Sequence, residues 1–117
     1  MIEKVKRLTS HELNQLKKFF SPVTFDNSFI LTYEGQVPPI GFVLLKGTIE
    51  LLKKNKIVMI VPPGFILGVQ QLIKNEATEF SYRVVSPSEI LVLQKSTILQ
   101  LLRDRQSEMY SILKQDL

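Results

Sequence analysis

A short loop in the middle of the chain has the residue types that could seat an anion. Pro62 and Pro63 remove two backbone donors and hold φ at about −65°, whereas Gly64 and Gly68 permit positive φ or a close approach by another group. The residues after Gly68 contain neither Gly nor Pro for at least one helical turn. The first turn of a helix leaves N–H groups free, and free N–H groups attract anions. The stretch therefore predicts a shaped loop that leads into a helix.

This loop resembles the phosphate-binding cassette of the cyclic nucleotide-binding domain family, which includes the sensory domain of catabolite activator proteins. The family cassette reads roughly Gly-Asp-x-x-Gly-Glu, then two aliphatic residues and, later, an arginine. Here the same frame runs from Gly64 to Gly68 and Val69, with Leu72 and Ile73 as the aliphatic pair. The glycines are present and the acidic residues are not.

Other segments match the family in the expected order. Gly35 and Gly47 stand at further family glycine positions, and the stretch 81–93 resembles the family sequence Thr-Val-Arg-Ala-Leu-Thr-Asp-x-Glu-Leu-x-x-Leu. The resemblance covers about residues 8 to 105. It implies a mainly β protein with a jelly-roll β-barrel (double-stranded β-helix), flanked by an N-terminal helix and C-terminal helices.

The hydrophobic pattern agrees with that fold. Short β-rich runs separated by turn residues favour a jelly roll or small β-sandwich; they are 23–25, 29–33, 42–45, 48–53, 57–61, 80–85 and 90–93. Lys53, Lys54, Asn55 and Lys56 form a predicted hairpin tip, in which Asn55 can take positive φ. We interpret the tip as a solubilising turn, with a partner-docking knob as the alternative.

Helices are predicted at both ends. Thr9 and Glu12 fit a capping box for a helix over 9–20. Thr97 and Gln100 fit a second capping box, and Ser107 could cap a last short helix. We expect one domain, 1–117, comprising a helical segment 1–22, a β-roll 23–94 with the cassette at 62–80, and helices over 95–117.

The residues that would contact a cyclic nucleotide are altered. The resemblance implies a Glu for the ribose hydroxyl, where this chain has Val69, and an Arg for the phosphate, where it has Thr78 beside Glu79. Loss of one partner of a buried charge pair costs about 2 to 5 kcal/mol. A cyclic nucleotide, or any other cofactor, is therefore not expected. A slipped alignment would instead make Arg83 the phosphate ligand, although a role on the strand surface is favoured.

The predicted ligand pocket is thus a vestigial cassette. Its residues are Gly64, Gly68, Val69, Gln70, Gln71, Thr78, Glu79, Phe80, Ser81 and Arg83. Phe80 replaces a small family residue, which predicts a partly filled pocket.

The C-terminal helix of the family commonly packs against its mate in a dimer. Leu102, Met109 and Leu113 keep a heptad-like spacing, and with Tyr110 and Leu117 they form the predicted dimer interface. The alternative is a helix folded back on its own barrel.

Composition narrows the function further. The chain has 117 residues, no Cys and a formal charge of +4 that is spread along it, so disulfides and thiolate zinc sites are excluded and nucleic-acid binding is not expected. His11 is the only histidine, which argues against a metal-dependent barrel enzyme. No transmembrane stretch or signal peptide is predicted, and a cytoplasmic location is expected.

We therefore expect a non-catalytic regulatory or protein-interaction module that has lost binding of cyclic AMP and cyclic GMP. We expect a homodimer and a protein partner, with no contact to a membrane. Two alternatives stay open: a sensor for a different small molecule in the remodelled pocket, and retained cyclic nucleotide binding, as in the sensory domain of a signalling or transcriptional regulator.

Overall fold

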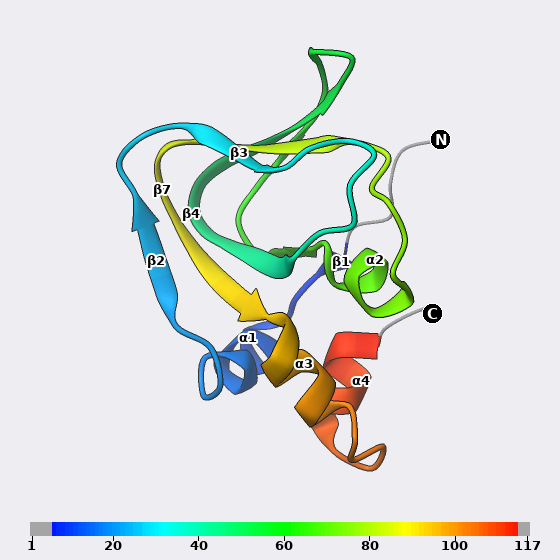
Figure 1. The fold of residues 1–117 in the computed structure, drawn as a ribbon. Coiled ribbons are helices and arrows are strands. Elements are labelled where there is room, and N and C mark those ends of the chain that lie inside the picture. The colour runs from blue at the N-terminus through cyan, green and yellow to red at the C-terminus, as the bar shows by residue number, and fades with distance from the viewer. Residues whose placement is uncertain (1–5, 115–117) are drawn as a thin grey trace.

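The computed structural model describes residues 6–114, and these form a bent antiparallel sheet with helices gathered at one end (Figure 1). The strands are β1 (Lys6–Arg7), β2 (Pro22–Phe25), β3 (Phe29–Thr32), β4 (Ile40–Lys53), β5 (Lys56–Val61), β6 (Phe65–Leu67) and β7 (Ser81–Gln94). The helices are α1 (Ser10–Leu16), α2 (Val69–Lys74), α3 (Lys95–Leu101) and α4 (Glu108–Lys114). The predicted mainly β jelly-roll fold, flanked by helices, is confirmed.

Two long strands organise the sheet. β4 and β7 pair with each other along most of their length, and the strand order is β1-β6-β4-β7-β2, with β3 on β7 and β5 on β4. The register of the β4–β7 pair shifts around Gly47, where φ is +99°. These irregularities bend both strands, so that one sheet wraps around a core without closing into a complete barrel.

The apolar side chains form two clusters on opposite sides of the sheet. The barrel cluster fills the concave side and includes Phe42, Leu51, Phe80 and Tyr82. The helical cluster lies between the sheet and the helices; its members come from α1, α2, α3, α4 and the sheet, including Leu16, Val69, Ile98 and Leu113.

Several local predictions are confirmed. Thr9 and Glu12 form the reciprocal capping box of α1, and Lys54 and Asn55 take positive φ at the β4–β5 tip. Ser107 also accepts a hydrogen bond from the N–H of Met109 at the start of α4. Local hydrogen bonds decide these features, so the short sequence signals suffice.

Other expectations need correction. Two long strands replace four short predicted ones: β4 contains the predicted strands 42–45 and 48–53, and β7 contains 90–93 and, except for Phe80, 80–85. The partner strands hold the chain extended through the bends. The predicted helix 9–20 ends at Leu16, and α3 starts at Lys95 without a side-chain cap, so Thr97 lies inside the helix. No helix among residues 6–114 has the length and apolar character needed to cross a membrane.

Candidate functional site

The glycines of the cassette serve the backbone of the protein itself. Gly64 has φ of +98°; its N–H donates to the carbonyl of Leu44, and its carbonyl accepts from the N–H of Leu8. Gly68 has φ of +80°, and a Cβ there would lie 3.2 Å from the carbonyl oxygen of Ile40. The loop backbone is thus pressed against β4, which requires glycine whether or not a ligand binds.

Val69, at the position of the family glutamate, is buried in the helical cluster at 2% exposure. A Cβ built on Gly41 would meet Cγ2 of Val69 at only 2.4 Å, so the valine methyl occupies the space that a side chain at position 41 would need. Val69 therefore joins α2 to β4 through packing. Its side chain offers no acceptor for a ribose hydroxyl.

Thr78, at the position of the family arginine, is tied to the loop that joins β3 to β4. Its N–H donates to the carbonyl of Gln36, its carbonyl accepts from the N–H of Gly35, and its hydroxyl donates to the carbonyl of Tyr33. The side chain is buried at 3% exposure. The neighbouring Ser81 makes a similar contact, since its hydroxyl accepts from the N–H of Glu34.

Aromatic side chains occupy the concave side of the sheet beyond the cassette. Phe80 is buried, and Tyr82 packs edge-to-face against Phe42 with ring centroids 5.2 Å apart. The hydroxyls of Tyr82 and of Thr32, its register partner on β3, are buried without a hydrogen-bond partner among residues 6–114. The interior is therefore mostly apolar, with two unpaired hydroxyls on the strand pair β3–β7.

Arg83 is engaged elsewhere. It alternates with the inward residues Tyr82 and Val84 along β7, and its guanidinium contacts the carboxylate of Glu50, its register partner on β4, with Nε 2.8 Å and Nη2 2.6 Å from Oε1. An ion pair across neighbouring strands neutralises both charges on the outer face of the sheet. Arg83 is thus a strand-surface residue in this structure.

Comparison with known proteins shows the fold. A scan against protein-family models finds no match, and no curated protein matches the sequence. Solved structures do match: a protein of a cyclic-GMP-dependent signalling pathway that regulates bacterial phytopathogenesis superposes with a TM-score of 0.75 at 20% identity, over 92% of this chain and 89% of that one. This chain has the fold of cyclic nucleotide-binding domains.

Two further solved structures with this fold come from a catabolite activator protein and a kinase regulatory subunit. The catabolite activator protein of Thermus thermophilus matches with a TM-score of 0.71 and 19% identity over 91% of this chain, which spans 52% of that protein. The regulatory subunit of a cAMP-independent protein kinase A from Trypanosoma brucei matches with a TM-score of 0.61 and 19% identity, over 94% of this chain and 44% of that one.

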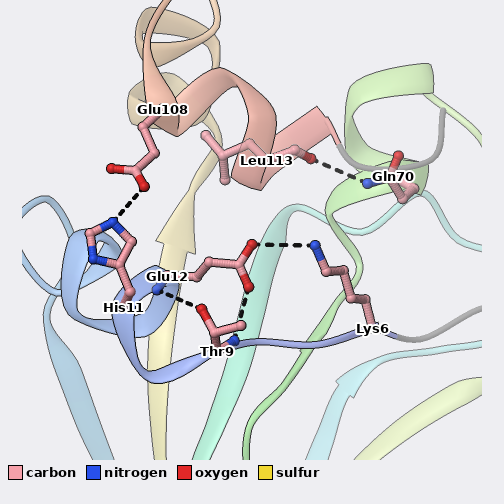
Figure 2. Close-up of polar contacts among 7 residues, drawn as sticks. All are labelled: Lys6, Thr9, His11, Glu12, Gln70, Glu108 and Leu113. Carbon is pink, nitrogen blue, oxygen red and sulfur yellow. Dashed lines mark hydrogen bonds and ion pairs between the residues drawn. The ribbon is translucent and has the colours of Figure 1, made fainter.

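In this cyclic nucleotide-binding fold, α2 is bonded to the C-terminal helix. Nε2 of Gln70 donates to the carbonyl of Leu113 in the last turn of α4, at 3.2 Å, while its Oε1 is buried without a partner among residues 6–114 (Figure 2). Gln71, the next residue of α2, is half-buried. Both glutamines of the predicted pocket therefore lie on a helix that packs into the protein.

The N-terminal helix holds the other end of α4. His11 Nε2 contacts the carboxylate of Glu108, the first residue of α4 (Figure 2). Side chains of α1 and α2 thus contact the two ends of α4.

The capping-box residue Glu12 has a lowered pKa. Burial by itself raises the pKa of Glu12, but the hydrogen bond from the Thr9 N–H and the contact with Lys6 outweigh burial, so the pKa lies below its ordinary value of 4.5.

The residues of the predicted dimer interface differ in how exposed they are in the single chain. Met109 and Leu113 are 4% and 0% exposed within the single chain, because they pack against the other helices in the helical cluster. Leu102 and Tyr110 are only half-buried, and Leu117 lies outside the described residues. Two of the five seam residues are therefore not available to a second copy.

Sequence reasoning missed one cation beside the cassette. The ammonium group of Lys53 donates to the carbonyl of Glu79 at 3.1 Å and lies 5.8 Å from the centre of the Phe80 ring. Lys53 ends β4, 26 residues before Glu79, and the pairing of β4 with β7, in which Leu52 lies opposite Ser81, brings it there. Glu79 itself is exposed.

These placements limit the chemistry of the site. Val69, Thr78 and Phe80 are committed to packing or to backbone bonds, and Arg83 is paired with Glu50. No group of three His, Asp or Glu residues within 6–114 is arranged to hold a metal ion. The arrangement can support a rigid binding surface better than acid–base or metal chemistry.

Proposed function

We propose that this protein is a non-catalytic regulatory and protein-interaction module whose cyclic nucleotide-binding fold no longer binds cyclic AMP or cyclic GMP. The observation that carries the proposal is the position of Val69. It stands where the family acceptor would be, and its side chain is packed into the helical cluster against Gly41. A residue so placed stabilises the α2–β4 contact and cannot bind a ribose.

The phosphate position supports the same proposal. Thr78 brings no charge, and its backbone and hydroxyl groups are occupied by the loop from Tyr33 to Gln36. The retained glycines do not argue against this, because Gly64 and Gly68 are explained by their own backbone contacts. The cAMP-independent kinase subunit that shares the fold is a precedent for a regulatory protein that does not depend on this ligand. A cytoplasmic location is part of the proposal.

Titration calorimetry with cyclic AMP, cyclic GMP and a cyclic dinucleotide tests the loss of binding. We expect no heat of binding at micromolar protein concentration for any of the three, because both charged anchors are absent. Micromolar binding of either mononucleotide would reject the proposal. If a mononucleotide binds, the same titration of Lys53→Gln tests whether Lys53, a cation beside the cassette, contributes to that binding.

A second candidate function is a sensor for an uncharged small molecule. The hydroxyls of Thr32 and Tyr82 support it, because buried polar groups are seldom left without partners and a bound molecule would satisfy them. Native mass spectrometry of freshly purified protein tests this candidate. A reproducible extra mass that Tyr82→Phe removes would favour the sensor over the first proposal.

A further inference from the structure

The edge strand β5 is apolar and exposed. Its register partners all lie in β4, so its other side has no strand neighbour among residues 6–114. Ile57, Val58 and Ile60 are 49%, 40% and 60% exposed, whereas Met59 and Val61 turn inward to the barrel cluster. A free edge with unpaired backbone groups and branched apolar side chains is a template for another strand.

The charges around β5 determine which strand fits. Lys54 and Lys56 stand at the hairpin tip, exposed, and neither ammonium group has an ion-pair partner within 6–114. The carboxylate of Glu34 accepts from the backbone N–H of Lys54, and Glu50 on the neighbouring strand is already neutralised by Arg83. With Lys53 beside Glu79, the tip keeps an excess of positive charge.

A second edge strand of the sheet, β2, differs from β5 in charge. β2 also has a free side, but it starts at Pro22, is followed by Asp26 and carries no lysine. Proline and lysine both discourage pairing between edges, and so does the register shift between β4 and β5 at Val58. Lysines exclude a cationic partner or a second lysine tip, while they favour a partner with carboxylates.

We propose that the β5 edge binds an extended segment of a partner protein that alternates branched apolar residues and carries acidic residues at its C-terminal end. Such a segment pairs antiparallel with Ile57–Val61, because that direction brings its carboxylates next to Lys54 and Lys56. This proposal rests on the protein-interaction function proposed above and specifies the kind of segment that the module binds. The β5 edge is separate from the cassette, so the calorimetry with nucleotides and the peptide experiment below test different claims, and either one can fail without the other.

Two fluorescent peptides test the proposal by polarisation. Both alternate threonine with valine and isoleucine; one ends in two glutamates and its matched control ends in two lysines. We expect saturable binding of the acidic peptide at sub-millimolar protein concentration, about fivefold or more tighter than the lysine peptide. Equal affinity of the two peptides, or no binding of the acidic one, would overturn the proposal.

Variants locate the site. Ile60→Lys is expected to weaken binding of the acidic peptide by about tenfold, and the double variant Lys54→Gln, Lys56→Gln is expected to erase the preference between the peptides. The controls are Val23→Lys on the β2 edge and Lys17→Gln, Lys18→Gln after α1, which should change neither. All these residues are exposed, and circular dichroism verifies that each variant is folded. Unchanged binding by Ile60→Lys, or a concentration-dependent dimer that Ile60→Lys abolishes, would reject a heterologous partner at this edge.

Discussion

At the scale of single residues, the side chains of the cassette are already engaged in contacts within the protein. Val69 and Phe80 are buried among apolar neighbours, and Thr78 satisfies the backbone of a crossing loop. These contacts are the basis of the proposed loss of nucleotide binding. The hydroxyl of Tyr82, like that of Thr32 and like Oε1 of Gln70, is buried and unpartnered in the described part of the chain.

Tyr82→Phe tests the unpartnered hydroxyl of Tyr82. Removal of a buried hydroxyl that makes no hydrogen bond also removes its desolvation cost, so we expect the free energy of unfolding to be unchanged or to rise by up to about 1 kcal/mol. Urea unfolding followed by circular dichroism measures it. A loss of more than about 1 kcal/mol would show that the hydroxyl has a partner in solution, as the sensor function requires. Tyr33→Phe, on an exposed tyrosine, is the control.

At the scale of elements, the cassette helix is positioned by complementarity with the strand beneath it. α2 packs over β4 at Gly41, where the missing side chain leaves room for Val69. This contact and the bond from Gln70 to Leu113 place α2 between the sheet and α4. A helix of six residues has little stability of its own, so tertiary packing must hold it.

A double-mutant cycle tests this packing. Gly41→Ala places a methyl 2.4 Å from Cγ2 of Val69, and overpacking of this kind costs about 1 to 3 kcal/mol. Val69→Ala removes the opposing methyl, so the double variant should be at least about 1 kcal/mol more stable than the sum of the single effects predicts. Leu72→Ala is the control, because Leu72 is buried in the same cluster but is not among the closest neighbours of position 41. Additive effects in the Val69 cycle would contradict the contact.

The elements were predictable to the extent that local signals define them. Thr9 with Glu12 and the positive φ of Asn55 are properties of a few neighbouring residues, so the α1 start and the β4–β5 turn could be predicted. β1 and β6 could not, because strands of two and three residues exist only through pairing with each other and with β4. For the site, the sequence predicts Val69 and Thr78 as replacements of the family glutamate and arginine, and this stays a prediction. Their burial depends on long-range packing, and the position of Lys53 beside Glu79 depends on the register of β4 with β7.

At the scale of the whole molecule, the C-terminal helix is an integral part of one chain's core. Its apolar residues, including Met109 and Ile112, pack with α1, α2 and α3 and with the outer side of the sheet. Polar contacts from His11 and Gln70 hold its two ends. The heptad-like spacing that suggested a dimer seam therefore also suits a helix that folds back on its own protein, and Met109 is buried within the single chain.

Leu113→Asp separates these roles. Leu113 is 0% exposed, and an unpaired carboxylate in an apolar core destabilises a protein by several kcal/mol. We therefore expect Leu113→Asp to lower the free energy of unfolding by at least about 3 kcal/mol and to unfold part of the protein at room temperature. Tyr110→Asp is the matched change at a half-buried position of the same helix and should keep the fold. Thermal unfolding measures the stability of each variant, and light scattering measures its mass. If Leu113→Asp instead yields a folded monomer from a wild-type dimer, Leu113 faces a second copy and the packing of α4 described above is wrong. A change of mass in Tyr110→Asp alone would assign any dimer to the exposed side of α4.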